Sequence, residues 1–200
     1  MRKTVSTTAA RRLARGSSST CRRPERMVSE AEKTLIHAVA LAAAVDADGP
    51  LCGVLLLGEA GAGKSSLALG FIETCPWRRS ALIADDAVLL AAKSGGLVAR
   101  APQTITGLIE IRGFGPASVR TAPPTRLWAA FRLCDDGERT PEPEVYAPIP
   151  GGPALAAYPF RYHGEAAIAP HRLRRIIRSI VGGQNWRCRH DSRSHLGMAE

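Results

Sequence analysis

One eight-residue segment, Gly58-Glu-Ala-Gly-Ala-Gly63-Lys64-Ser65, constrains this chain more than any other. It matches the phosphate-binding pattern G-x-x-x-x-G-K-[ST] at every fixed position. Glycines let backbone N–H groups turn toward one phosphate, Lys64 brings a positive charge to the β- and γ-phosphates, and the Ser65 hydroxyl is placed to ligate Mg²⁺. The pattern predicts a nucleoside triphosphate site formed by Gly58, Glu59, Ala60, Gly61, Ala62, Gly63, Lys64, Ser65 and Ser66.

The residues around this segment have the order that a phosphate-binding loop requires. An apolar run at 51–57 predicts a buried strand, and residues 64–73 predict a helix with Leu67, Ala68, Phe71 and Ile72 on one face. The helix N-terminus adds a positive end to the site. The loop alone does not separate ATP from GTP, or a kinase from an ATPase or a switch protein.

The rest of the chain predicts short strands, one further helix and a mixed sheet. Strands are predicted at 35–39, 81–84, 88–92, 97–101, 107–111, 128–134 and 154–158. The segment at 88–92 reads as a hairpin partner or a continuation of 81–84. Residues 112–116 predict a loop and 135–153 a largely irregular stretch, whereas 170–181 predict a helix with arginines opposite its apolar face. We expect an α/β fold.

The charge of the chain lies in its tails. Of 27 Lys/Arg and 18 Asp/Glu, residues 1–27 hold eight and one, and residues 171–200 hold seven and two. The remaining body is slightly acidic, which argues against nucleic-acid binding as the main function. We expect a basic disordered tail or a mis-assigned start at 1–27, with a transit peptide as the alternative. A catalytic domain is expected at 28–170, and a C-terminal helix with a basic tail at 171–200.

Cysteine usage and hydropathy exclude two further classes. The five cysteines are widely spaced and form no C-x-x-C, so a zinc site is not supported, and reduced thiols in a cytoplasm are the default. No apolar run is long enough for a membrane-spanning helix, so no membrane partner is expected.

Two acidic residues end the predicted strand at 81–84. Asp85 and Asp86 follow Lys64 by 21 and 22 residues, the usual place of a metal-binding carboxylate in such folds. Adjacent side chains on an extended chain point to opposite sides, so one carboxylate could face Mg²⁺ and the other an acceptor hydroxyl. The alternative is an exposed Asp-Asp turn.

Glu110 and Arg112 form a second candidate pair, in Gly107-Leu-Ile-Glu-Ile-Arg-Gly-Phe-Gly115. Two residues apart, they share one face of a strand. A carboxylate for metal and a guanidinium for phosphate would suit phosphoryl transfer. The alternative is an ion pair across the sheet.

Taken together, four segments in this order resemble HPr kinase/phosphorylase, which phosphorylates a serine of the phosphocarrier protein HPr. They are Leu35-Ile-His37, Gly58–Ser65, Leu82-Ile-Ala-Asp85-Asp86 and Gly107–Gly115. The resemblance implies a P-loop kinase with a mixed sheet, similar to phosphoenolpyruvate carboxykinase. It implies that Lys64 binds ATP phosphates and that Ser65 and Glu110 ligate Mg²⁺. It implies Asp86 as general base on the HPr serine, and as acid in the reverse, phosphate-consuming reaction, with Asp85 in support.

The same resemblance assigns three further catalytic residues. His37 matches an active-site histidine, Arg112 would contact the phosphoryl group, and Arg139 resembles a later catalytic arginine. For His37 alone, a buried structural histidine is the simpler reading of the residue.

The chain departs from the family pattern in several places. The extra N-terminal domain of long members has no match, so the chain resembles a short form with the C-terminal catalytic domain only. Ser66 stands where many members have an acidic residue, and the C-terminal segment tied to the reverse reaction is not found. The resemblance implies a cytoplasmic enzyme that regulates carbon metabolism through the phosphotransferase system, and oligomers are usual in the family. Two alternatives stay open, namely a kinase of this fold acting on another protein or a small molecule, and a non-catalytic nucleotide-binding regulatory module.

Overall fold

The computed structural model describes residues 33–135 and 141–183 of the 200-residue chain. The elements in chain order are β1 (Lys33–His37), β2 (Val39–Ala43), β3 (Cys52–Leu57), α1 (Lys64–Glu73), β4 (Ala81–Ala84), β5 (Ala87–Lys93), β6 (Gly96–Arg100), the short 3-10 helix η1 (Gln103–Ile105), β7 (Leu108–Ile111), β8 (Gly115–Ser118), β9 (Thr125–Cys134), β10 (Glu144–Tyr146), β11 (Leu155–Arg161) and α2 (Ala169–Val181).

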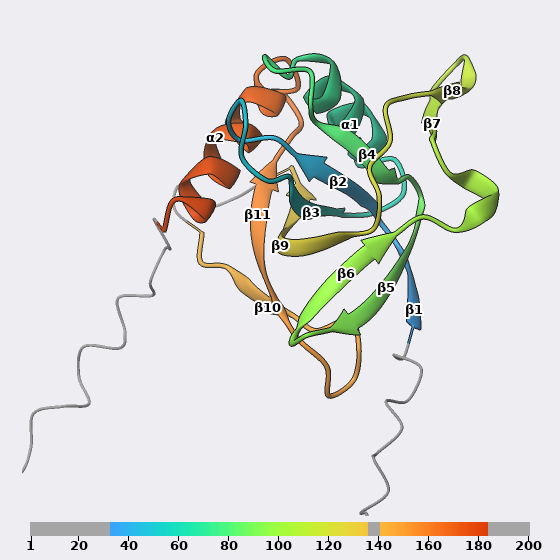
Figure 1. Ribbon diagram of the computed structural model, residues 1–200. Coiled ribbons are helices and arrows are strands. Elements are labelled where there is room, and N and C mark those ends of the chain that lie inside the picture. Colours follow the sequence, from blue (N-terminus) through green and yellow to red (C-terminus); the bar gives the residue numbers. More distant parts are fainter. Residues whose placement is uncertain (1–32, 136–140, 184–200) are drawn as a thin grey trace, which may run out of the picture.

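Nine strands form one mixed sheet, which confirms the predicted α/β class. The strand order is β1-β5-β6-β9-β3-β2-β4, and β11 pairs with β9 on one side and β10 on the other. The pairs β3–β9 and β9–β11 are parallel, while the neighbouring pairs along the rest of the sheet are antiparallel. Strand β9 is long enough to pair with β6 through its first residues and with β11 through its last. The hairpin β7–β8 stands apart as a two-stranded sheet (Figure 1).

The long strands bury a separate core on each face. Both helices cover one face, where Phe71 of α1 and Leu173 of α2 pack with Phe131 of β9. On the other face, Leu90 and Leu97 of the β1-β5-β6 arm pack against the central strands. Figure 1 shows the helices on one side of the sheet and this arm folded away from them. The result is three layers, namely helices, central sheet and the strand arm.

The parallel strands fix the place of the site. Strands β3, β9 and β11 run in one direction, so their carboxyl ends meet at one edge of the sheet. Open α/β sheets bind ligands in the crevice at such an edge. Here β3 leads into the phosphate-binding loop, β9 into Asp135 and β11 into Tyr162.

Several predicted elements have different extents or partners. The strand predicted at 35–39 is two strands, because the chain breaks at Ala38, whose N–H donates to the carbonyl of Asp86 at 3.2 Å. Strand β5 continues β4 across a turn but pairs with β1 and β6, so the hairpin interpretation was wrong. The predicted loop 112–116 runs into β8, and the irregular stretch contains β10. Among the described residues, no helix has the length and apolar character to cross a bilayer.

Candidate functional site

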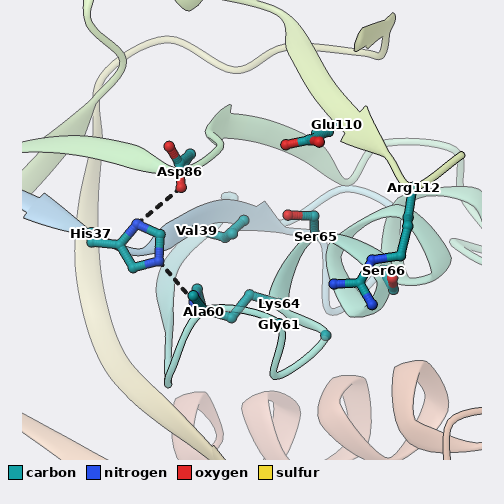
Figure 2. A pocket seen from close by; sticks show the side chains of 11 residues that line it. His37, Val39, Ala60, Gly61, Lys64, Ser65, Ser66, Asp86, Glu110 and Arg112 are labelled. Atoms are coloured by element: carbon teal, nitrogen blue, oxygen red, sulfur yellow. Dashed lines mark hydrogen bonds and ion pairs between the residues drawn. The ribbon is translucent and has the colours of Figure 1, made fainter. Parts of the chain in front are cut away.

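The phosphate-binding loop connects β3 to α1 and borders a pocket of about 290 Å³. Gly61 and Gly63 have φ angles of 83° and 90°, values that a side chain would strain, so the backbone requires glycine at these two positions of the loop. Helix α1 begins at Lys64, and the positive end of its dipole therefore meets the pocket. The pocket is lined by His37, Val39, Ala60, Gly61, Gly63, Lys64, Ser65, Ser66, Asp86, Glu110 and Arg112 (Figure 2).

Lys64 is buried and its ammonium is fully bonded within the site. Its Nζ donates to the carbonyls of Gly58 and Glu59, both at 2.8 Å, and lies 3.1 Å from Nε2 of His37. Three donors thus meet three acceptors. Burial lowers the pKa of Lys64, opposed by the negative charges of Asp86, Asp85 and Glu59. The lysine therefore rests on its own loop, and a phosphate has to draw it away from these carbonyls.

His37 joins Lys64 to Asp86 (Figure 2). Its Nδ1 lies 2.9 Å from Oδ1 of Asp86, and its side chain is half exposed rather than buried. Because the Lys64 ammonium can only donate, Nε2 must accept, and the hydrogen of a neutral imidazole then lies on Nδ1 and is donated to Asp86. The reading of His37 as a buried structural histidine was wrong, because half of its side chain is exposed.

Asp86 occupies a strained turn between β4 and β5. Its φ of 65° is unusual for a residue with a side chain, and the N–H of Ala87 donates to the carbonyl of Asp85 at 2.7 Å, which closes a three-residue γ-turn. The bond from Ala38 holds the Asp86 carbonyl. Strain of this kind collects at functional sites, where the surrounding structure enforces it. The turn leaves the Asp86 carboxylate exposed and facing the pocket.

Asp85 is buried and connects three elements. Its Oδ1 accepts from the Ser65 hydroxyl at 2.8 Å, and its Oδ2 accepts from the backbone N–H of Glu110 at 3.0 Å. It therefore ties the start of α1 to β7. The two adjacent carboxylates have different partners, since Asp86 pairs with His37, but the chain turns at Asp86 and is not extended there as predicted.

Glu110 and Arg112 reach the pocket from the β7–β8 hairpin. Both are exposed, and Figure 2 shows Glu110 on the side of Ser65 and Arg112 on the side of Ser66. Within the described part of the chain neither residue makes an ion pair, so the structure does not support the cross-sheet alternative. Both residues line the pocket, but only Glu110 lies on β7, because the strand ends at Ile111 and Arg112 lies in the turn that follows.

Two residues at the site, Val39 and Tyr162, were not predicted from the sequence. Val39 lines the pocket, and Tyr162 packs against Gly63 from behind the loop. Neither belongs to a motif, and no sequence signal could have linked Tyr162 to a loop about a hundred residues earlier. Arg139 lies outside the described residues.

The oxygen atoms beside the loop fit a magnesium ion. The Ser65 hydroxyl and the Glu110 carboxylate are hard oxygen ligands on one side of the pocket, and Asp85 orients the Ser65 hydroxyl. Within residues 33–135 and 141–183, no cluster of three or more His, Cys, Asp or Glu side chains could hold a metal alone. Mg²⁺ is commonly bound by one or two carboxylates and by substrate phosphates, which matches this sparse set.

Comparison with known proteins confirms the resemblance predicted from the sequence. Residues 30–122, a little under half of the chain, match the model of the HPr serine kinase C-terminal domain. The HPr kinase/phosphorylase of Bordetella pertussis is 44% identical over 70 residues, which cover 34% of this chain and 21% of that protein. The enzyme of the same name from Clostridium botulinum (strain Eklund 17B) is 39% identical over 108 residues, 54% of this chain and 31% of that protein. The matched region thus spans less than a third of these relatives.

A solved structure confirms the fold over a larger part of the chain. The Hpr(Ser) kinase/phosphatase from Coxiella burnetii superposes with a TM-score of 0.55 at 24% identity, covering 76% of this chain and 95% of that one. The likeness therefore extends beyond the residues that the family model matches.

Proposed function

We propose that this chain transfers the γ-phosphoryl group of ATP to a serine hydroxyl of an HPr-like phosphocarrier protein. The observation that carries the proposal is the chain of contacts from Lys64 through His37 to Asp86, beside the contact of Ser65 with Asp85. The Lys64 ammonium would hold phosphate on one side of the pocket, and the Asp86 carboxylate faces the space where an acceptor hydroxyl can enter. The names of the related proteins supply the protein substrate.

The charge of each site residue indicates its role: positive groups would bind phosphate, and oxygen ligands would bind Mg²⁺. Backbone N–H groups of the loop and the Lys64 ammonium would bind the phosphates, and the Arg112 guanidinium contributes positive charge beside Gly61 of the loop. Ser65 and Glu110 would hold Mg²⁺, which when bound neutralises charge on the β- and γ-phosphates. Asp85 fixes the Ser65 hydroxyl by accepting its hydrogen.

Asp86 would be the general base. A serine hydroxyl is a weak nucleophile, and a positioned carboxylate that removes its proton contributes about 10²–10⁴-fold in rate. The serine oxygen forms the new bond to the γ-phosphorus, the bond to the β–γ bridging oxygen breaks, and ADP leaves. The Nδ1–H of His37 would donate a hydrogen bond to the Asp86 carboxylate, which orients this carboxylate and stabilises its negative charge.

The experiment combines the chain with labelled ATP, Mg²⁺ and HPr, for the native protein, for Asp86→Asn and for Asp48→Asn as an exposed acidic control. We expect Asp86→Asn to lower kcat by about 10²–10⁴-fold with a nearly unchanged Kd for MgATP, since the base does not bind the nucleotide. Asp48→Asn should behave as the native chain.

Two results would replace this proposal. Label that reaches only an acceptor other than HPr would identify a kinase of the same fold with another substrate. Nucleotide binding without any transfer would identify a regulatory module. Incubating the chain with serine-phosphorylated HPr and inorganic phosphate tests the reverse reaction. We propose a cytoplasmic location for the chain, where ATP and an HPr-like protein would both be available.

A further inference from the structure

The last glycine of the loop lies against an aromatic ring from the far end of the fold. Gly63 has a φ of 90°, and a Cβ built on it would lie 2.7 Å from Cδ1 and 3.2 Å from Cζ of Tyr162. Real Cβ atoms essentially never come within 3.0 Å of another heavy atom in this way. The ring therefore fills the space that any side chain at position 63 would need.

The position of this ring is set by two strands. Tyr162 directly follows β11, whose last residue Arg161 pairs in parallel with Cys134 of β9. The backbone N–H of Tyr162 donates to the carbonyl of Cys134 at 3.2 Å, and the side chain packs against the helix-side core. The ring is thus held by the central sheet and does not depend on the loop for its place.

The other end of the loop rests on the same part of the sheet. A Cβ on Gly58 would lie 3.4 Å from both Cβ and the carbonyl oxygen of Leu133, the residue before Cys134. Residues of the loop face the pocket on one side, as Figure 2 shows for Gly61 and Lys64. The loop is therefore enclosed between the pocket in front and the ends of β9 and β11 behind.

We propose that Tyr162 is a positioning residue, whose ring forms the rear wall of the phosphate-binding loop and holds its N–H groups in the phosphate-binding arrangement. The inference rests on the proposed function. A glycine-rich loop has many accessible conformations, and confining it before binding removes an entropic cost that would otherwise reduce affinity. Ring carbons make the contact, so phenylalanine should serve as well as tyrosine.

The competing explanation is that Gly63 is needed only for its φ angle. In that case an alanine at position 63 does the same harm whether or not the ring is present. If the ring is the wall, removing it makes room for the new Cβ, and the two substitutions are not additive. The coupling between positions 63 and 162 therefore separates the two explanations.

The experiment measures binding of magnesium pyrophosphate and of MgATP to the full chain by calorimetry, for Tyr162→Phe, Tyr162→Ala, Gly63→Ala and the double variant. We expect Tyr162→Phe to bind within about twofold of the native chain and Tyr162→Ala to bind both ligands roughly tenfold more weakly. The loss caused by Gly63→Ala should be at least about fivefold smaller in the Tyr162→Ala background.

Tyr158→Ala is the matched control. Tyr158 lies on β11, is partly buried in the same core and stacks on Phe131 with ring centroids 5.8 Å apart, yet it does not reach the loop. Its removal should lower the melting temperature without changing either Kd. Equal losses from Gly63→Ala in both backgrounds, or equal weakening of binding by Tyr158→Ala and Tyr162→Ala, would overturn the inference.

Pyrophosphate binding keeps this test apart from the proposed function. Absence of transfer to HPr, with pyrophosphate binding and the coupling intact, removes the proposed substrate and leaves the role of Tyr162 standing. Transfer to HPr without the coupling between positions 63 and 162 removes the role of Tyr162 and leaves the proposed function standing. A native chain that binds neither ligand overturns both.

Discussion

The backbone of Asp86 is strained, because its φ angle is positive. An aspartate at φ 65° is held in place by the γ-turn bond of Ala87 and by the Ala38 N–H, and in return its carboxylate meets His37. Conformations of this kind cost about 1–3 kcal/mol each. Function and local stability therefore pull in opposite directions at this residue.

Replacing Asp86 by glycine should stabilise the fold and abolish phosphoryl transfer. Glycine adopts positive φ without strain but loses more backbone entropy on folding, so we expect a net gain on the order of 1 kcal/mol, or roughly 2–4 °C in Tm. Calorimetric melting checks the stability. A lower Tm than that of Asp86→Asn, which keeps the side-chain shape, would contradict the strain argument.

His37→Ala should lower kcat by about tenfold while changing MgATP affinity little. Without the imidazole, the Lys64 ammonium loses an acceptor and the Asp86 carboxylate loses a donor. His37→Gln should recover part of the rate, because its amide offers one acceptor and one donor. Steady-state kinetics with HPr measures both variants, and equal rates for the two would remove the bridging role.

The junction of α1 and α2 is a polar contact within an apolar layer. The buried guanidinium of Arg174 donates to the carbonyls of Phe71 and Thr74 at the C-terminal end of α1 and lies 4.3 Å over the ring of Phe71. Burial lowers the pKa of Arg174, and Cys75, which follows Thr74 in the chain, opposes this shift. This contact fixes the helix whose N-terminus forms the phosphate site.

Stability should rise with pH between about 7 and 9 because of Cys75. Burial raises the pKa of this thiol, but hydrogen bonds from Ser80 and from the backbone at Arg79 and Trp77 outweigh it and lower the pKa to about 7 from 9.0. The folded pKa is the lower one, so the stabilisation is full above pH 9 and is lost as pH falls through 7. Denaturant unfolding of the native chain and of Cys75→Ala should differ more at pH 9 than at pH 7. A constant difference would show that the folded thiol titrates like a free one.

The three-layer arrangement brings together residues from three distant parts of the chain. Strand β3 delivers the loop, the β4–β5 turn delivers Asp85 and Asp86, and the β7–β8 hairpin delivers Glu110. Hydrogen bonds from Ser65 and Glu110 to Asp85 join these parts at the pocket. A ligand that binds here therefore links these three parts of the chain and should stabilise the whole fold.

MgATP at about 100 times its Kd should stabilise the native chain by about 2.7 kcal/mol, because only the folded state binds it. The gain corresponds to a rise in Tm of roughly 5–10 °C. Lys64→Ala should lose most of this shift, and chelation of Mg²⁺ should reduce it. Thermal melts with and without chelator measure both effects. An equal rise in Tm for the native chain and for Lys64→Ala would show that the nucleotide binds elsewhere.

Short sequence patterns were enough to predict the local parts of the site. The phosphate-binding loop, helix α1 over 64–73, strand β4 and the acidic pair after it were all predicted within a residue, because each depends on a short pattern of glycines, apolar periodicity or charge. The order of these patterns also predicted the resemblance to HPr kinase/phosphorylase, which the match to the family model confirms. The catalytic role of each residue stays a prediction.

The contacts between residues that are distant in the chain could not be predicted and depend on how the strands and helices pack. Pairing of β5 with β1 and β6, the bridge of His37 between Lys64 and Asp86, and the ring of Tyr162 behind Gly63 join positions far apart in the chain. Local propensity carries no information about such partners, since a buried strand satisfies its pattern equally well beside several neighbours. Packing of the two cores selects one set of neighbours, and that selection places the side chains around the pocket.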